Sequence, residues 1–405
     1  MDNWIDKKSL EELVKSNIIK LDRGRVISSI DLATIIGEYP VYSSSAQNNG
    51  HFGSYGLFDF DEELITWSVD GGGYFFYRPK HKFSVTNVSG ILRVLNTGKI
   101  NYKFIYYLFC FQHSNQIFDY VDKAHPSVIK KRYFVPTIDV AEQLSIANIL
   151  SKTDQAIAQT EAIIAKYTLV KTGLMQDLLT KGIDENGNIR TEQNHEFKDS
   201  PLGRIPKEWD VKKMGDLMLA IDPQPDHRTP PAFIDGVPYV GISDFVSNGE
   251  IDIKNCRKVG FNVLGKQRNS FTIELGDLIF GKIGTIGKPK ILPDFNKLHF
   301  TLSANVILIK PIECPDFIYW TLVSDYISNQ VSLAIHSTSQ PAFGMEKIRD
   351  LNVLTPKPEE RYRITEKLKK IDELFSKEHI KLSKLQSLKM GLMQDLLTGK
   401  VRVKI

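Results

Sequence analysis

The chain has 405 residues, of which 42% are hydrophobic and 25% are charged, and its formal net charge is +4. These values are typical of a soluble protein of two or three domains, and they exclude a uniformly basic protein, so any contact with nucleic acid must come from local patches. Three scattered cysteines argue against a disulfide framework and favour a reducing cytoplasm. The longest apolar run, residues 104–111, is too short for a membrane span of roughly 20 residues, and no charged-then-apolar leader opens the chain, so we expect a cytoplasmic protein.

Residues 1–138 are expected to form a first globular domain of the α+β class. Ser9 and Glu12 have the spacing of a capping box and predict a short helix. Short runs of β-forming residues follow, separated by Gly, Asn, Ser and Pro. They predict strands over residues 39–42, 64–67, 74–77 and 90–94. An apolar stretch over 102–120 favours a helix.

Residues 139–181 predict the first of two long helices. From Ile146 to Leu178 its apolar residues recur in alternating steps of four and three, which is the pattern of a coiled-coil seam. Gly182 follows directly and is typical of a helix end. About 40 helical residues span about 60 Å, and a helix with so narrow an apolar stripe requires a partner.

The rest of the chain repeats this order. Residues 182–200 are polar and without periodicity, so they predict an exposed linker. Residues 201–356 predict a second globular domain, residues 357–399 a second long helix that ends at Gly399, and residues 400–405 a short tail.

An internal repeat connects the two halves. The octapeptide Gly-Leu-Met-Gln-Asp-Leu-Leu-Thr occupies 173–180 and again 391–398, and at this fixed offset 17 of the 46 positions from Val135 to Thr180 are identical. Weaker echoes between the two globular regions suggest that the repeating module is a domain plus a helix. We therefore predict two mixed α/β domains at opposite ends of an antiparallel coiled coil, related by a pseudo-two-fold axis.

No catalytic motif is recognisable in the sequence. The run from Gly281 to Lys288 lacks the spacing of a phosphate-binding loop, since Pro289 stands where Ser or Thr belongs. The glycines at 71–73 lack the dinucleotide-binding spacing. Nine histidines show no metal-ligand pattern, and no Asn-Pro-Pro-Tyr run of an amino-methyltransferase is present. The sequence therefore favours a non-catalytic protein with neither metal nor cofactor.

Polar and basic loops of the first domain are candidates for DNA binding. Asn and Gln can pair with adenine edges, Ser can reach bases or phosphates, and Lys, Arg and His attract the DNA backbone. The candidates are Ser43, Ser44, Ser45, Gln47, Asn48, Asn49 and His51 in one loop, Arg78, Lys80 and Lys82 in a basic turn, and His125, Lys130, Lys131 and Arg132 in another. Solvated turns would give the same composition.

The second domain has corresponding candidates. Three lysines surround its glycine loop, and a second run combines a histidine with small polar residues. The candidates are Lys282, Lys288 and Lys290, and His336, Ser337, Thr338, Ser339 and Gln340. Ordinary turn chemistry is the alternative here also, but two domains that each carry such a pair favour DNA binding.

The chain resembles the specificity subunit of type I restriction–modification systems over essentially its whole length. The markers are the doubled octapeptide, the run Pro-Leu-Gly-Arg-Ile-Pro-Lys-Glu-Trp at 201–209, Tyr-Pro-Val-Tyr-Ser-Ser at 39–44, Val-Pro-Tyr-Val-Gly-Ile-Ser at 237–243, and Pro358 with two glutamates at the start of the second helix. The start of the first helix departs from the family pattern because it lacks the usual prolines.

The resemblance implies that each domain reads one half of a bipartite, asymmetric double-stranded DNA target while the helices set the spacer. It also implies that two adenine methyltransferase subunits dock on the helices and that two restriction–translocase subunits can join, in a complex that defends a cell against phage. S-adenosylmethionine and ATP would be cofactors of those partners and not of this chain.

We expect the methyltransferase copies to dock beside the octapeptides, where some residues lie partly off the seam. The candidates are Met175, Gln176, Asp177, Met393, Gln394 and Asp395. Two alternatives of other classes stay open at this point. One is a self-contained DNA methyltransferase or nuclease with a divergent site, and the other is a coiled-coil scaffold whose domains bind no DNA.

Overall fold

The chain is divided into two compact units. The computed structural model describes residues 4, 6–70, 72–116, 118, 123–224, 228–246, 249–295, 298–336 and 342–403. The first unit comprises Met1–Ala162 and Ile380–Ile405, and the second comprises Ile163–His379. Each unit therefore contains one globular domain together with one half of each of two long helices.

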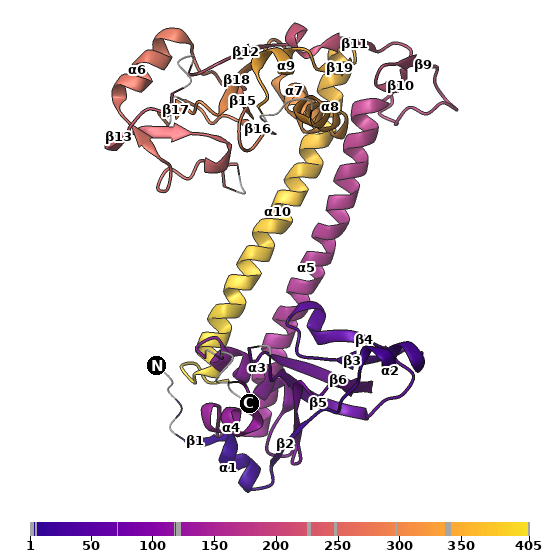
Figure 1. Ribbon diagram of the computed structural model, residues 1–405, viewed down its shortest axis with the longest axis vertical. Helices are drawn as coiled ribbons and strands as arrows, with labels where there is room; N and C mark the ends of the chain where they lie inside the picture. Colours follow the sequence, from indigo (N-terminus) through magenta and orange to yellow (C-terminus); the bar gives the residue numbers. More distant parts are fainter. Residues whose placement is uncertain are drawn as a thin grey trace. The chain divides into compact units, whose positions relative to one another are not determined.

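A six-stranded sheet is the centre of the first unit (Figure 1). Its strand order is β2-β7-β5-β6-β3-β4, and all neighbours are antiparallel except β3 and β6. The strands are β2 Ile19–Arg23, β3 Tyr39–Tyr42, β4 His51–Tyr55, β5 Phe60–Ser68, β6 Phe75–Val85 and β7 Ser89–Val94. A separate antiparallel pair joins β1 Lys7–Ser9 to β8 Phe134–Pro136. The predicted strands are thus confirmed, although β6 runs much further than expected.

Short helices surround this sheet. They are α1 Leu10–Lys15, α2 Ser29–Thr34, η1 Gln47–Gly50, α3 Tyr102–His113 and α4 Pro126–Arg132. The capping box predicted at Ser9 is present, since Ser9 and Glu12 each bind the other's backbone N–H. Helix α3 is buried against the sheet, where Phe104 and Phe109 share one core with Trp67.

The second unit contains more and smaller sheets. A four-stranded antiparallel sheet has the order β12-β18-β15-β16, and a three-stranded sheet has the order β14-β13-β17. The strands are β9 Phe197–Ser200, β10 Gly203–Pro206, β11 Asp210–Lys213, β12 Met218–Ile221, β13 Ala232–Val240, β14 Lys258–Val259, β15 Leu278–Gly281, β16 Gly287–Ile291, β17 Thr301–Leu302, β18 Val306–Pro311 and β19 Asn352–Thr355. The helices are η2 Met214–Asp216, η3 Ile242–Asp244, α6 Phe261–Ser270, α7 Pro315–Val323, α8 Asp325–His336 and α9 Met345–Arg349.

The two domains share one topology. The order β12-β18-β15-β16 repeats β2-β7-β5-β6, and the pair β11-β19 repeats β1-β8. Strand β13 pairs in parallel with β17 and antiparallel with β14, as β3 pairs with β6 and β4. The prediction that the repeating module is a domain plus a helix is therefore confirmed.

The two long helices are α5 Val140–Thr180 and α10 Pro358–Leu397, and both lie inside the predicted bounds. Helix α5 is capped by the Asp139 carboxylate, which accepts a hydrogen bond from the Ala141 N–H. Gly182 and Gly399 follow the helices in left-handed conformations, and a Cβ on either would collide with Trp209 or Trp4 respectively. Glycine is therefore required at both helix ends.

Within each unit the two helix halves run antiparallel, side by side (Figure 1). In the second unit, Lys171 of α5 binds Asp372 of α10, and its ammonium lies 5.3 Å from the Trp320 ring centroid. In the first unit, Lys389 of α10 binds Asp154 of α5 at 2.6 Å and faces Tyr107. These pairs occupy equivalent positions of the repeat, so the seam lysines that interrupt the apolar pattern are compensated in the same way twice.

The octapeptides connect the helices to the domain cores. Leu178 and Leu179 are buried in the core of the second unit, and Leu396 and Leu397 in that of the first. The sequence assigns Leu178 and Leu396 to the helix seam, whereas the structure buries them in the domains. At the other end of each octapeptide, Gly173 and Gly391 are helical, and a Cβ on either would meet nothing within 4 Å.

The predicted exposed linker is wrong in part, because part of it packs on the start of α10. Ile183 is buried, and its N–H donates to Glu360 at 3.0 Å. Arg190 is buried with Glu360 and forms two hydrogen bonds with its carboxylate, which also accepts from the Trp209 indole at 3.1 Å. The polar, aperiodic sequence gives no sign of this packing, because the contact with Glu360 depends largely on one arginine, Arg190.

The C-terminal residues have the equivalent role in the first unit. Arg402 donates two hydrogen bonds of 2.7 and 2.6 Å to Glu142 at the start of α5, and these bonds lower the pKa of that carboxyl. The Trp4 indole donates to the Leu397 carbonyl at 2.8 Å. Glu142 and Glu360 are equivalent in the repeat, so the first turn of each long helix is fixed by the segment that follows the other helix.

Candidate nucleic-acid interface

The polar loop of the first domain connects β3 to β4. Ser43 begins it, donates its N–H to the Gly50 carbonyl at 2.8 Å and accepts from Thr86 at 3.0 Å. Within it, Asn48 and Asn49 have positive φ of 48° and 52°, which asparagine tolerates better than most residues. Ser45, Gln47, Asn48, Asn49 and His51 are exposed, and Ser44 is half-buried. The loop therefore presents amide and hydroxyl groups to solvent.

The basic turn predicted around Arg78 is not a turn. Strand β6 runs through it, and the Arg78 side chain is only 1% exposed. Its two predicted companions are exposed, with Lys82 lying 4.8 Å from the Phe58 ring centroid. Pro79 and the surrounding charges imitate a turn. The register of β6 against β5 shifts here, because Leu64 pairs with Arg78 whereas Glu62 pairs with His81. This irregularity interrupts the alternation of side chains, so Arg78 is buried while Lys80 and Lys82 are exposed.

The second basic cluster lies on α4. His125 caps this helix by accepting the Ser127 N–H, and Lys130 lies 3.7 Å from Glu11. Lys131 is exposed, and the Arg132 guanidinium lies 4.9 Å from the Phe118 ring centroid. The last turn of α4 therefore contains three consecutive basic residues, of which Lys131 is the most open to solvent.

In the second domain the predicted lysines are dispersed. Lys282 is largely buried and bonds to Asp222 at 2.7 Å, so its charge is balanced inside the domain. Lys288 is exposed with a positive φ of 50°, and Lys290 lies 5.8 Å from the Phe245 ring centroid. His336 is the last residue of α8, and Ser337, Thr338, Ser339 and Gln340 lie outside the described residues.

A polar cavity of about 460 Å³ lies in the second domain where β13 ends. Its lining includes Ser243, Arg257, Thr285 and Asn305. None of these four was selected by sequence reasoning, although the run at 237–243 was one of the family markers. The position is equivalent to the β3–β4 loop, because Tyr239 pairs in parallel with Thr301 as Val41 pairs with Ser84.

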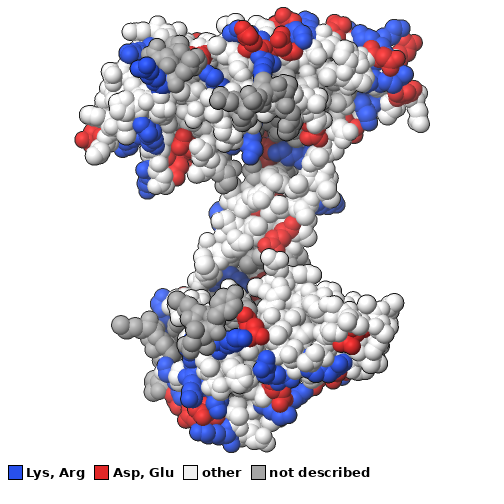
Figure 2. Space-filling view, viewed as in Figure 1, with Lys and Arg blue, Asp and Glu red and all other residues white. Residues whose placement is uncertain are grey.

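Charge is distributed locally on both domains. On the face shown in Figure 2, basic and acidic side chains are intermixed in each domain. This matches the small net charge of the chain and favours recognition by particular loops.

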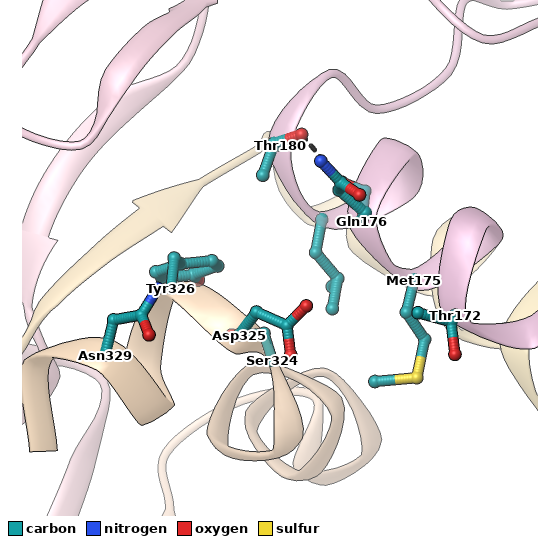
Figure 3. Close-up of a pocket in the computed structure, with 9 residues that line it drawn as sticks. Thr172, Met175, Gln176, Thr180, Ser324, Asp325, Tyr326 and Asn329 are labelled. Carbon is teal, nitrogen blue, oxygen red and sulfur yellow. Dashed lines mark hydrogen bonds between the residues drawn. The ribbon is translucent and has the colours of Figure 1, made fainter. Parts of the chain in front are cut away.

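Each octapeptide borders a groove. In the second unit a groove of about 360 Å³ is lined by Met175, Gln176, Leu179 and Thr180 from α5 and by Asp325 and its neighbours at the start of α8 (Figure 3). In the first unit a groove of about 380 Å³ is lined by the equivalent Gln394, Leu397 and Thr398 together with residues of α3. Two similar surfaces therefore occur at equivalent places of the repeat.

The other predicted docking residues, Asp177, Met393 and Asp395, do not line these grooves. Asp177 pairs with Lys181 at 2.8 Å, and Asp395 pairs with Lys400 at 2.8 Å. Met393 packs, half-buried, on the core of the first unit.

A chain in which a mixed α/β domain and a long helix occur twice, with a polar site at the same strand end of each domain, is a protein of two binding domains. A family model described as "Type I restriction modification DNA specificity domain" matches residues 2–168 and 206–387. The chain therefore belongs to this family.

Curated relatives have similar sequences. The specificity subunit of the type I restriction enzyme MjaVIII from Methanocaldococcus jannaschii is 27% identical over 289 residues, which are 67% of this chain and 62% of that subunit. The specificity subunit of the type I restriction enzyme MpnII from Mycoplasma pneumoniae is 40% identical over 93 residues, 23% of this chain and 28% of that subunit. The first alignment thus spans less than two thirds of the relative's own length.

The fold is shared with a solved structure. The S subunit of a type I restriction–modification system from M. genitalium matches with a TM-score of 0.63 at 15% identity, covering 100% of this chain and 97% of that one. At this identity the likeness shows the fold. No described helix of this chain combines the length and the apolar character that crossing a membrane requires.

Proposed function

We propose that this chain is the non-catalytic specificity subunit of a type I restriction–modification enzyme and recognises a bipartite double-stranded DNA target. The duplication carries this proposal, because the two domains repeat one topology and each places polar groups at the same strand end. Membership of the specificity-domain family supports it.

The two half-sites differ in sequence, so the whole target is asymmetric. The first domain presents three serines at positions 43–45 where the second has Gly241, Ile242 and Ser243. Hydroxyl, amide and guanidinium groups read base edges by different donor and acceptor patterns, so unlike loops read unlike bases.

Two copies of a methyltransferase subunit dock at the two grooves that contain Gln176 and Gln394. The grooves are equivalent in the repeat and combine apolar and polar groups, which suits two copies of one protein. S-adenosylmethionine and ATP belong to the methyltransferase and to two restriction–translocase subunits, in the cytoplasm. The three unpaired cysteines accord with a reducing compartment.

Methylation mapping tests this function. The chain is produced with its methyltransferase in cells that lack other adenine methylation, and methylated adenines are located across the genome. We expect a single motif of two short fixed sequences separated by a fixed number of unspecified bases. A contiguous motif, or methylation without any motif, would contradict the proposal.

The alternatives predict other results. A self-contained enzyme would bind S-adenosylmethionine as an isolated chain, which calorimetry detects directly. A scaffold whose domains bind no DNA would give the assembled complex the same DNA affinity when Lys131 and Lys80 are replaced by Ala. For a DNA-binding subunit, the slope of log binding constant against log salt concentration should fall by about one unit for each phosphate contact removed.

A further inference from the structure

The guanidinium of Arg78 is a buried cation, and no carboxylate among the described residues forms an ion pair with it. Its Nε donates to the Thr66 hydroxyl at 3.0 Å, but neither terminal nitrogen has a hydrogen-bond partner among the described residues. Burial lowers the pKa of this side chain to about 10, so it still carries its charge at neutral pH. Buried hydrogen-bond donors without a partner are energetically costly, and they are rare in native proteins.

Aromatic rings compensate part of this charge. The guanidinium carbon lies 3.6 Å from the ring centroid of Tyr42 and 4.9 Å from that of Phe76. The Tyr42 hydroxyl is bonded to His81 at 3.1 Å, which fixes the ring. A cation on a ring face is attracted by the π system, yet the N–H groups at the edge of the guanidinium keep their need for acceptors. The rings therefore orient the fork and leave its terminal donors available.

The polar loop between β3 and β4 covers these donors. A Cβ on Gly50 would lie 3.1 Å from the Arg78 Nη2 atom, so the loop backbone passes directly over it. Asn48, Asn49 and Gly50 are three successive residues with positive φ. Such a run is unfavourable for residues that carry a side chain, and strain of this kind is typical of segments that change on binding.

The equivalent place in the second domain is open. There the end of β13 borders the polar cavity, and the exposed Arg257 lines it with one terminal nitrogen bonded to the Pro230 carbonyl at 2.6 Å. Each domain thus places an arginine beside the loop that follows its parallel-paired strand, which is β3 in the first domain and β13 in the second. In the first domain the loop closes over it, and in the second the site is accessible.

We infer that Arg78 is a specificity-determining residue of the first half-site, and that its terminal nitrogens bind a pair of DNA acceptor atoms when the loop at 43–50 moves aside. This inference rests on the proposed function. The planar fork of arginine matches two acceptors at once, either the O6 and N7 atoms of a guanine or two phosphate oxygens. DNA then supplies the partners that the folded domain withholds.

Methylation mapping of variants of the full chain, produced with its methyltransferase, tests the role. Arg78→Met removes the charge and all donors, and Arg78→Lys keeps the charge without the fork. Arg93→Met is the matched control, because Arg93 lies in the same sheet and binds Glu62 and Asp22 within the domain. Thermal unfolding of each variant shows whether it is folded.

We expect Arg78→Met to reduce methylation of the motif by roughly tenfold to hundredfold and to relax the first half-site only. Arg78→Lys should keep part of the rate and show the same relaxation, which a purely structural role would not produce. If Arg78→Met does not fold, Arg78→Lys decides. A folded Arg78→Lys variant with the wild-type motif and the wild-type rate would overturn the inference.

Modified DNA distinguishes the two sources of acceptors. Guanines of the first half-site are replaced by 7-deazaguanine in one set of duplexes, and single phosphates by methylphosphonate in another. A modification that weakens binding of the wild-type complex but not of the Arg78→Met complex identifies the contacted group. Contact with a guanine supports the inference, whereas contact with phosphates alone would overturn it, because phosphates carry no sequence information. Further loss in the variant at every position would refute it. A wild-type chain with no two-part motif would instead refute the proposed function itself.

Discussion

Glu360 shows how single residues hold the second unit together. Its carboxylate accepts hydrogen bonds from a backbone N–H, an arginine and an indole, which lie between 151 and 177 residues before it in the sequence. Both members of the ion pair with Arg190 are buried. Removing one member of such a pair leaves an uncompensated charge, which is much more costly than the net contribution of the intact pair.

Glu360→Ala should therefore lower the free energy of unfolding by about 3–5 kcal/mol. Glu359→Ala is the control, since Glu359 is exposed in the same helical turn and should change the stability by less than about 0.5 kcal/mol. Denaturant unfolding followed by circular dichroism measures both. Equal effects of the two substitutions would show that the buried cluster contributes nothing of its own.

Glu142 predicts a pH dependence. Its pKa is lowered in the folded chain by the hydrogen bonds from Arg402, so its contribution to stability is complete above the usual glutamate pKa near 4.5 and is lost as the pH falls through the lower folded value. Arg402→Ala should flatten the fall of stability between about pH 5 and pH 3. Unfolding at a series of pH values measures this, with Lys400→Ala as a neighbouring control. Parallel curves for wild type and Arg402→Ala would exclude the linkage.

At the scale of elements, the sequence predicts what is periodic or repeated. The seam pattern and the doubled octapeptide give both long helices to within about two residues, and β-forming runs give four strands of the first sheet. Contacts made by single residues escape such reasoning, because Arg190 and Arg402 lie in polar segments whose composition is that of a linker. The burial of Arg78 escaped for a related reason, since a proline and neighbouring charges concealed that β6 continues through this segment.

The octapeptide glycines make a prediction of this scale. Gly173 and Gly391 lie inside helices with open space beside them, and glycine there destabilises a helix by about 0.5–1 kcal/mol relative to alanine. Gly173→Ala and Gly391→Ala should each raise the free energy of unfolding of the isolated chain by about that amount. Thermal unfolding checks this, and Gly182→Ala, whose Cβ would collide with Glu360, should do the reverse. A loss of stability in Gly173→Ala would contradict the open space seen in the structure.

At the scale of the whole molecule, the proposed function makes the helices a spacer between half-sites. Seven residues are two helical turns and add about 10 Å, or about three base pairs, to a helix. Inserting seven residues at equivalent positions of both helices should lengthen the unspecified part of the motif while leaving both half-sites unchanged. The same insertion in α5 alone shifts one seam against the other and should reduce methylation strongly.

Methylation mapping measures both insertion variants. If the double insertion leaves the spacer length of the motif unchanged, the helices do not determine the distance between the half-sites. The domain boundaries along the chain stay predictions. The residues that read bases also stay predictions, because neither repeats nor periodicity show which loop atoms contact DNA.

The two exposed helical glycines also bear on how long the chain survives in a cell. They weaken both long helices at equivalent places, and weakened helices open more often to proteases. A partner that packs on the adjoining grooves would close these places. We therefore expect the chain to be degraded faster when it is made without its methyltransferase than when both are made together, and Gly173→Ala with Gly391→Ala to lengthen the lifetime of the unassembled chain. Pulse–chase labelling would measure this, and the supply of the partner would then set the amount of specificity subunit that a cell retains.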